Sequence, residues 1–145
     1  MSEDALARRV AEAMYAKDRA AQALGIRIER VAAGEAELSM EVRADMLNGH
    51  GICHGGLIFT LADTAFAYAC NSRNLRSVGA QATMVFLDGA GEGETLVAEA
   101  QEAALVGRSG VYNVSVRTDA GRPVAEFQGF SRSIGGHYIE LGDSE

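Results

Sequence analysis

The sequence predicts an α+β domain in which one curved antiparallel sheet wraps around a single central helix. An apolar run over residues 55–70 is too uniform for a surface helix and requires burial on every side. Two strand-like segments precede this run and four follow it, and short turns between them favour antiparallel pairing. With 145 residues, 48% of them hydrophobic and 23% charged, the chain is expected to form one domain, 1–145.

The N-terminal segment is predicted to form one helix over residues 5–24 that packs on the domain. Its apolar residues recur at helical spacing, and its polar face mixes both charges, which favours packing over binding to a membrane surface. Ser2 is suited to cap the start of this helix and Gly25 to end it. The apolar positions are Leu6, Val10, Ala13, Met14, Ala21 and Leu24.

The next elements are read from the change in periodicity. Residues 35–42 alternate apolar and polar side chains, as in a strand with one wet face, and residues 26–32 pair with them through a turn at 33–34. A loop over 44–53 leads into the buried helix, predicted over 54–72. The remaining strands are expected at 78–86, 94–106, 110–118 and 123–134, with a hairpin turn at 119–121.

Composition excludes several classes of protein. A net charge of −7 argues against nucleic-acid binding, and two cysteines do not form a disulfide scaffold. The segment Met1–Asp4 lacks the basic start of a secretion signal, so we expect a cytoplasmic protein. The apolar run 55–70 is too short to span a bilayer and carries Asp63 in its middle.

Asp63 is the first candidate functional residue, because it is the only formally charged residue from Leu47 to Ser72. Burial of a carboxylate is costly and shifts its pKa, and acids with shifted pKa values cluster at functional sites. The alternative is a carboxylate that caps a helix or lies at a wet edge. Its position in the middle of an apolar helix argues against both.

Two further candidates lie at the start of the same helix and in the loop that leads into it. His54-Gly55-Gly56 opens the helix, where free backbone amides at the positive end of the helix dipole can stabilise an oxyanion. The alternative is a plain flexible helix start. Asn48 lies in the approach loop, where its amide can donate to a carbonyl or hold a water, or can serve only as a turn residue.

Other catalytic motifs are weak. His50, Cys53 and His54 match no standard zinc spacing and have no evident fourth ligand, so we expect no metal. No residue is placed to activate Cys53 as a nucleophile, and Cys70 is expected in the core. The sequence contains no phosphate-binding loop of the Gly-Lys-Ser/Thr type.

The segment Asn48-x-x-Gly51-x-x-His54-Gly55-Gly56-x-x-Phe59-x-x-Ala62-Asp63 resembles the active-site motif of the hotdog-fold acyl-CoA thioesterases. It is most similar to the phenylacetate-degradation (PaaI-like) branch, and the order of elements extends the resemblance over about residues 5–135. The resemblance implies a hotdog fold with five or six antiparallel strands around the helix. It also implies hydrolysis of acyl-CoA thioesters without a metal or another cofactor.

The resemblance assigns roles to individual residues of this chain. Asp63 matches the catalytic carboxylate, acting as nucleophile or general base, and the Gly55 N–H matches the donor to the thioester oxygen. Asn48 matches the polar residue that orients substrate or water, and His54 and Thr64 match supporting positions.

The resemblance also bears on the substrate. It implies an aryl-acetyl or hydroxylated aryl-acetyl group. The turn containing Arg108, Ser109 and Gly110 resembles a segment that lies near CoA, although a solvated turn is the alternative. Arg73 and Arg76 are weaker candidates for binding CoA. The acyl pocket is expected to involve residues that could equally belong to the core, namely Phe59, Phe66, Tyr68 and Met84.

Two other functions stay open from the sequence. A hotdog hydratase or dehydratase acting on acyl carriers commonly uses a catalytic histidine with an acid partner, and His54 keeps this possibility. A non-catalytic acyl-CoA-binding module is the other, although a binding module has no need of an acid in an apolar helix.

The spacing of Gly55 and Asp63 predicts a site shared by two chains. Eight residues on a helix span about 12 Å along its axis. The carbon under attack must lie within roughly 3–4 Å of both the carboxylate and the oxyanion donor. Two antiparallel helices related by a twofold axis satisfy this condition. We therefore expect a homodimer at least, and a dimer of dimers (a homotetramer) as the full assembly.

Overall fold

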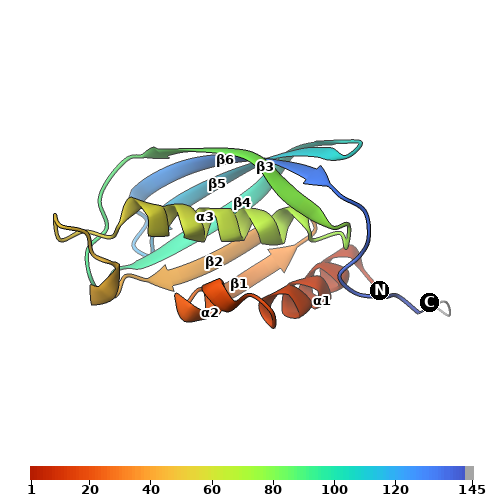
Figure 1. The fold of residues 1–145 in the computed structure, drawn as a ribbon, viewed down its shortest axis with the longest axis horizontal. Helices are drawn as coiled ribbons and strands as arrows, with labels where there is room; N and C mark the ends of the chain where they lie inside the picture. Colours follow the sequence, from red (N-terminus) through yellow and green to blue (C-terminus); the bar gives the residue numbers. More distant parts are fainter. Residues whose placement is uncertain (143–145) are drawn as a thin grey trace.

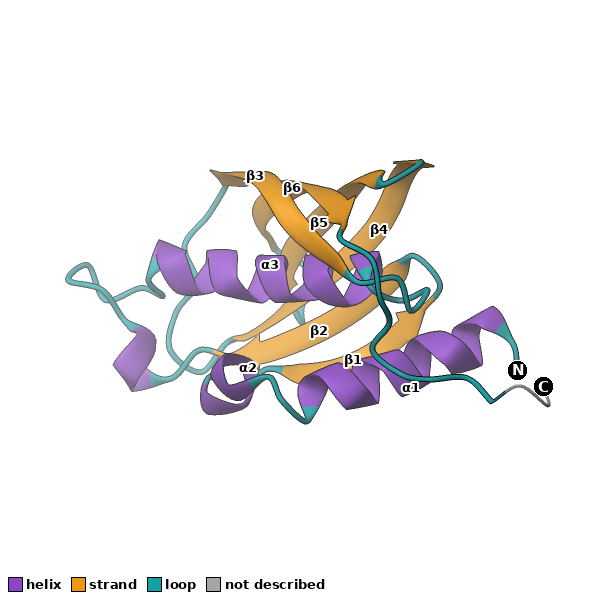
Figure 2. Cartoon of the chain, turned by 45° about the vertical axis from the view of Figure 1, so that its right-hand side comes forward, coloured by secondary structure: helices purple, strands orange, loops and turns teal. Residues whose placement is uncertain are grey.

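The computed structural model describes residues 1–142 and shows one six-stranded antiparallel sheet curved around a helix (Figures 1 and 2). The strand order is β1-β2-β4-β5-β6-β3. This architecture confirms the predicted α+β class and the six-stranded alternative. The last three residues of the predicted domain, 143–145, lie outside the described residues. The elements are α1 (Glu3–Tyr15), α2 (Arg19–Ala23), β1 (Arg27–Ala32), β2 (Glu35–Glu41), η1 (Ala44–Met46), α3 (Gly55–Cys70), β3 (Ser77–Phe86), β4 (Thr95–Val106), β5 (Ser109–Thr118) and β6 (Pro123–Ser133).

The N-terminal helix is broken, which corrects the prediction of one helix over 5–24. Ser2 caps α1 as expected, its Oγ accepting a hydrogen bond from the Ala5 amide at 3.1 Å. The break falls where Asp18 Oδ1 accepts from the Ala21 amide at 3.1 Å and so begins α2. A capping side chain at Asp18 competes with continuation of α1. Gly25, with φ +69°, follows the end of α2, as the sequence predicts.

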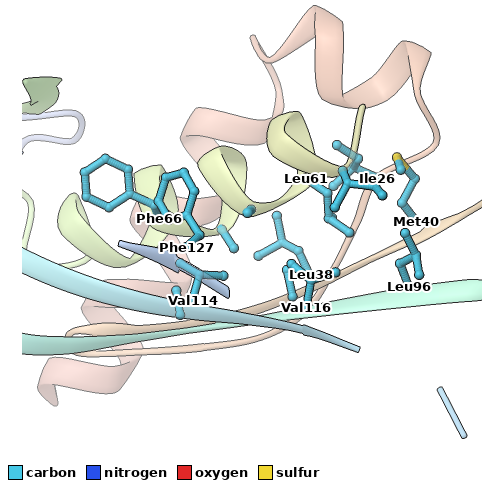
Figure 3. Close-up of a cluster of buried hydrophobic side chains, with 14 of the residues drawn as sticks. Ile26, Leu38, Met40, Leu61, Phe66, Leu96, Val114, Val116 and Phe127 are labelled. Carbon is cyan, nitrogen blue, oxygen red and sulfur yellow. The ribbon is translucent and has the colours of Figure 1, made fainter. Parts of the chain in front are cut away.

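The core lies between α3 and the concave face of the sheet (Figure 3). From α3, Phe66 packs in this core, with its ring centroid 5.6 Å from that of Tyr112 and 5.8 Å from that of Phe127. Gly129 on β6 makes this packing possible, because a Cβ there would lie 2.8 Å from Phe66 Cε1. The side chains on α3 that face the sheet are therefore held rigidly.

One face of α3 is open in the single chain, which corrects the expectation of burial on every side. Asp63 and Gly56 are exposed, and Phe59, Thr60 and Thr64 are only half-buried. β3 is the edge strand on this side of the sheet, and its apolar side chains are also exposed in the single chain. The exposed apolar residues of β3 are Val78, Val85 and Phe86. Within residues 1–142, no helix is both long enough and apolar enough to cross a membrane.

Candidate active site

The loop before α3 holds Asn48 in a fixed orientation. The backbone N–H of Asn48 donates to the Ile52 carbonyl at 2.8 Å, and Leu47 and Cys53 form an antiparallel bridge. Asn48 Oδ1 accepts from the His50 amide at 2.9 Å. Because the oxygen faces the loop backbone, Nδ2 points away from it and has no hydrogen-bond partner within residues 1–142. Asn48 is therefore a turn residue that also presents a free donor.

The three residues at the start of α3 differ in their hydrogen bonds. His54 Nδ1 accepts from the Gly56 amide at 3.2 Å, and the His54 amide donates to the Met46 carbonyl at 2.8 Å. The Gly55 amide is left without a partner in the described part of the chain, at the positive end of the helix dipole. A Cβ on Gly55 would lie 3.2 Å from the Phe86 ring, so glycine fits this close approach.

Asp63 lies in the middle of α3 on its open face. Its side chain is exposed in the single chain, not buried as the sequence predicts, and it has no hydrogen-bond partner within residues 1–142. Desolvation by its neighbours nevertheless raises the pKa of the carboxyl above its ordinary value. Thr64, next to it, donates from Oγ1 to the Thr60 carbonyl at 2.6 Å and so bonds within the helix.

The structure keeps the predicted separation of Gly55 and Asp63. α3 is continuous over all 16 residues from Gly55 to Cys70, so the two groups remain about 12 Å apart along its axis. The loop brings Asn48 toward the Gly55 end of α3, because Cys53 and His54 pair back on Leu47 and Met46. One chain therefore presents an oxyanion donor at the start of α3 and a carboxylate on the open face of α3, at separate places.

The predicted CoA-binding residues divide into two groups. Arg108 lines a cavity of about 230 Å³ at the end of α3, together with Arg73 and Ser131. Arg73 is also paired with Glu102, which accepts a hydrogen bond from the Tyr112 hydroxyl at 2.9 Å. Two further predicted residues, Ser109 and Gly110, begin β5 and pair with β6, and they are not among the residues that line this cavity. Arg76 lies instead over the Tyr138 ring, 5.2 Å from its centroid.

The proposed acyl-pocket residues also divide. Phe66 and Tyr68 are buried in the core, and the Tyr68 hydroxyl donates to Asp18 at 3.2 Å. Phe59 and Met84 are only half-buried and pack against the edge of that core. Of the four predicted residues, only these two are open to a ligand in the single chain.

Other predicted sites can be placed as well. Among residues 1–142, no three His, Cys, Asp or Glu side chains lie close enough together to bind a metal ion. Cys53 and Cys70 are both buried, and burial raises the pKa of each thiol. The sequence did not single out Phe86, whose ring packs on Gly55. The only trace of it in the sequence is that an apolar residue ends the segment of β3.

Comparisons with known proteins identify the family. Residues 50–125 match the thioesterase superfamily. The acyl-coenzyme A thioesterase PaaI of Escherichia coli K12 is 48% identical over 126 residues, which are 87% of this chain and 90% of that protein. The structure of the E. coli PaaI protein from the phenylacetic acid degradation operon superposes with a TM-score of 0.93 at 46% identity, covering 94% of this chain and 99% of that one.

A second solved structure supports the same assignment. It is a single-residue variant of the phenylacetic acid degradation protein PaaI from Thermus thermophilus, with a TM-score of 0.78 at 38% identity. The match covers 81% of this chain and all of that one. The sheet wrapped around α3, the motif at its start and these similarities agree with one another: the chain is a hotdog-fold member of the thioesterase superfamily.

Proposed function

We propose that this single-domain protein is an acyl-CoA thioesterase that hydrolyses aryl-acetyl-CoA or hydroxylated aryl-acetyl-CoA to the free acid and CoA. The observation that carries the proposal is that one helix, α3, has an unpartnered Gly55 amide at its start and the Asp63 carboxylate on its open face, both within the described residues. The similarity to a protein named as an acyl-coenzyme A thioesterase, at 48% identity, supports the choice of CoA thioesters. The relatives from phenylacetic acid degradation support the choice of an aryl-acetyl group.

The chemistry follows from these groups. Asp63, as a carboxylate, attacks the thioester carbon or removes a proton from the attacking water. The Gly55 amide stabilises the negative charge that develops on the thioester oxygen, and Asn48 Nδ2 orients the substrate or the water. If Asp63 attacks, the C–S bond breaks to give an anhydride between the acyl group and Asp63, and water then hydrolyses this anhydride and frees the carboxylate. If Asp63 acts as a general base, water adds directly and the C–S bond breaks. In both routes the water supplies the hydroxyl of the product acid and the proton with which CoA leaves as its thiol. Side chains and a backbone amide of the described residues supply all these roles, so the proposed mechanism needs no cofactor.

The site is proposed to form between two subunits. The offset of about 12 Å along α3 prevents one chain from placing its Gly55 and Asp63 at the same carbon. The exposed face of α3 and the apolar edge strand β3 support pairing on this side, with Gly55 of one chain facing Asp63 of the other. A dimer of dimers is the full assembly that we propose.

The cavity between Arg108 and Arg73 is proposed to bind the phosphates of CoA. The guanidinium group of Arg108 has no ion-pair partner within residues 1–142, and several residues with hydroxyl groups line the same cavity. Arginine binds phosphate oxygens through a planar set of donors. Ser109 and Gly110 support this site from β5, by fixing the turn that carries Arg108.

The test is release of free thiol from a panel of aryl-acetyl and straight-chain acyl-CoAs, with Asp63→Asn as the matched variant. We expect turnover that favours the aryl-acetyl thioesters, near-complete loss in Asp63→Asn, and full activity after EDTA treatment. Hydration of an enoyl thioester without thiol release would identify the hydratase alternative. Tight acyl-CoA binding without turnover would identify a binding module. Loss of activity with EDTA and its recovery with zinc would indicate a zinc site at His50, Cys53 and His54.

A further inference from the structure

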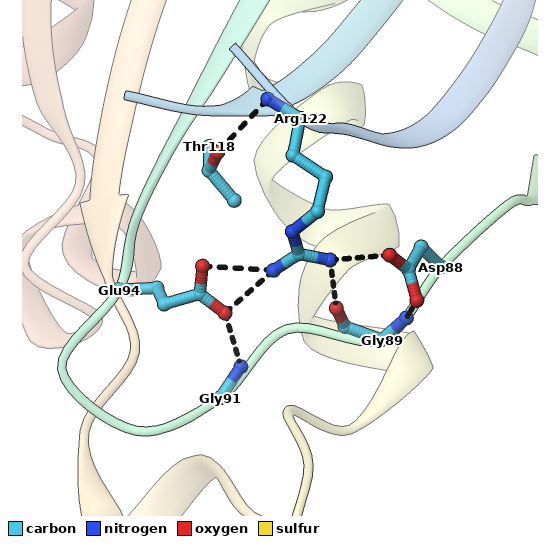
Figure 4. A network of polar contacts seen from close by, with 6 residues as sticks. All are labelled: Asp88, Gly89, Gly91, Glu94, Thr118 and Arg122. Atoms are coloured by element: carbon cyan, nitrogen blue, oxygen red, sulfur yellow. Dashed lines mark hydrogen bonds and ion pairs between the residues drawn. The ribbon is translucent and has the colours of Figure 1, made fainter. Parts of the chain in front are cut away.

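The loop between β3 and β4, residues 87–94, contains three glycines and no helix or strand. One side chain from outside the loop ties it together (Figure 4). Arg122, from the turn between β5 and β6, donates to Asp88 Oδ2 at 2.6 Å and to the Gly89 carbonyl at 2.7 Å. Its other terminal nitrogen donates to both oxygens of Glu94, at 2.7 and 2.8 Å. Arg122 therefore joins both ends of this loop.

The carboxylates that bind Arg122 also order the loop backbone. Asp88 Oδ1 accepts from the Gly89 amide at 2.8 Å, and Glu94 Oε1 accepts from the Gly91 amide at 2.8 Å. Hydrogen bonds to Arg122 and to these amides hold the pKa values of both carboxyls below their ordinary range. The loop is thus fixed immediately on each side of Ala90.

Ala90 is the point at which this loop meets the proposed active site. It is fully buried, and its carbonyl accepts a hydrogen bond from the Cys53 amide at 2.7 Å. The Ile52 side chain packs on the same loop, because a Cβ on Gly89 would lie 3.1 Å from Ile52 Cδ1. Cys53 directly precedes His54 and Gly55, so its hydrogen bond to Ala90 ties the segment that leads into α3 to this loop.

We infer that Arg122 is a positioning residue for hydrolysis: it holds loop 87–94 so that Ala90 fixes the segment carrying Asn48 and the Gly55 amide. This inference rests on the proposed function. Arg122 itself acts only through the loop. A shift of about 1 Å in a catalytic group can lower the rate on the order of 100-fold, so loss of this cross-link is expected to reduce turnover without removing any reacting group.

The test compares Arg122→Ala and Arg122→Lys with two controls. Arg30→Ala removes another arginine with an ion pair, to Glu35 at 3.0 Å, on the hairpin of β1 and β2. Val10→Ala truncates a buried side chain of α1. It supplies a destabilised variant whose lesion lies far from the loop. The readouts are kcat and KM for thioester hydrolysis, and the hydrogen-exchange rate of the Cys53 amide measured by NMR.

The expected result is a fall in kcat of roughly 10-fold or more in Arg122→Ala with a much smaller change in KM. The Cys53 amide should exchange at least about 10-fold faster, because its acceptor carbonyl is no longer held in place. Arg122→Lys should lie between Arg122→Ala and the wild type, since one ammonium cannot bind Asp88 and Glu94 in the same fork. Both controls should keep the wild-type kcat and the wild-type exchange rate of Cys53.

Unchanged kcat, unchanged exchange at Cys53, or an equal loss in Val10→Ala overturns the inference. If Arg122→Ala does not fold, Arg122→Lys decides by the same two readouts. If the wild-type protein hydrolyses no acyl-CoA, the proposed function fails. The exchange rate of the Cys53 amide then still decides whether Arg122 positions this segment.

Discussion

His54 Nδ1 accepts a hydrogen bond from the Gly56 amide, with 3.2 Å between the two nitrogens. The imidazole therefore caps α3 and has no acidic partner within residues 1–142. A hydratase of the hotdog type commonly needs a histidine that works with an acid, whereas a thioesterase needs the Gly55 amide beside this cap to stay free. The hydrogen bond between His54 and Gly56 therefore favours thioester hydrolysis over hydration.

Replacement of His54 by asparagine should preserve thioester hydrolysis, because an asparagine Oδ1 can also cap the helix. His54→Ala should lower the free energy of unfolding by about 1 kcal/mol, as expected for loss of an N-terminal cap. Chemical denaturation and thiol-release assays measure the two effects. Loss of turnover in a stable His54→Asn variant would indicate a direct chemical role for the imidazole.

The pH dependence of kcat/KM should report Asp63. The carboxylate is the active form and desolvation raises its pKa, so the rate should rise with pH through a midpoint above that of an ordinary aspartate. Steady-state kinetics between acidic and neutral pH measure this midpoint. A midpoint at or below the ordinary value would contradict the role of Asp63, provided that the protein stays folded across the range.

The stability of the protein should also depend on Asp63. Its pKa is higher in the folded than in the unfolded state, so the folded state binds more protons between the two values. This contribution is fully present below the unfolded pKa and is lost as pH rises through the folded pKa. Asp63→Asn should therefore raise Tm at neutral pH and have little effect at low pH. Thermal unfolding at both pH values measures the difference, with Asp119→Asn as an exposed control whose carboxylate has no ion pair within residues 1–142.

Subunit exchange should reveal whether each active site spans two chains. Asp63→Ala and Asn48→Ala are each expected to be inactive, which must be measured first. In a mixed dimer, one site receives intact Asn48 and intact Asp63, while the other receives both lesions. Activity should reappear on mixing. It should approach half of the wild-type activity per mixed dimer, because one of the two sites is intact. Confirmed exchange without recovery would falsify the shared site.

Gly129→Ala should destabilise the core without touching the proposed site. The new Cβ would lie within 2.9 Å of three atoms of the Phe66 ring, and such overpacking typically costs about 1–3 kcal/mol. Gly49→Ala is the matched control, because no heavy atom lies within 4 Å of its added Cβ in the described part of the chain. Urea denaturation of both variants measures the effect. Equal stabilities would show that Phe66 moves aside without cost.

Local patterns in the sequence determine the class of fold and the key candidates. Alternating residues define the β2 strand, the uniform apolar run defines α3, and Gly25 ends the N-terminal helical region. The motif from Asn48 to Asp63 points to the thioesterase superfamily, and the comparisons confirm that assignment. These features depend on side-chain spacing within one segment, which is why they can be read without a structure.

Tertiary structure decides the features that depend on contacts between distant segments. Asp18 breaks the N-terminal helix and also accepts from Tyr68, fifty residues later. β3 joins the sheet beside β6, at its edge, and Asp63 lies on an open face of α3. Arg122 contacts the loop that fixes Cys53, although neither its spacing nor its neighbours in the sequence single it out. Periodicity records which side of an element is apolar, but the order of strands in the sheet determines what that side meets.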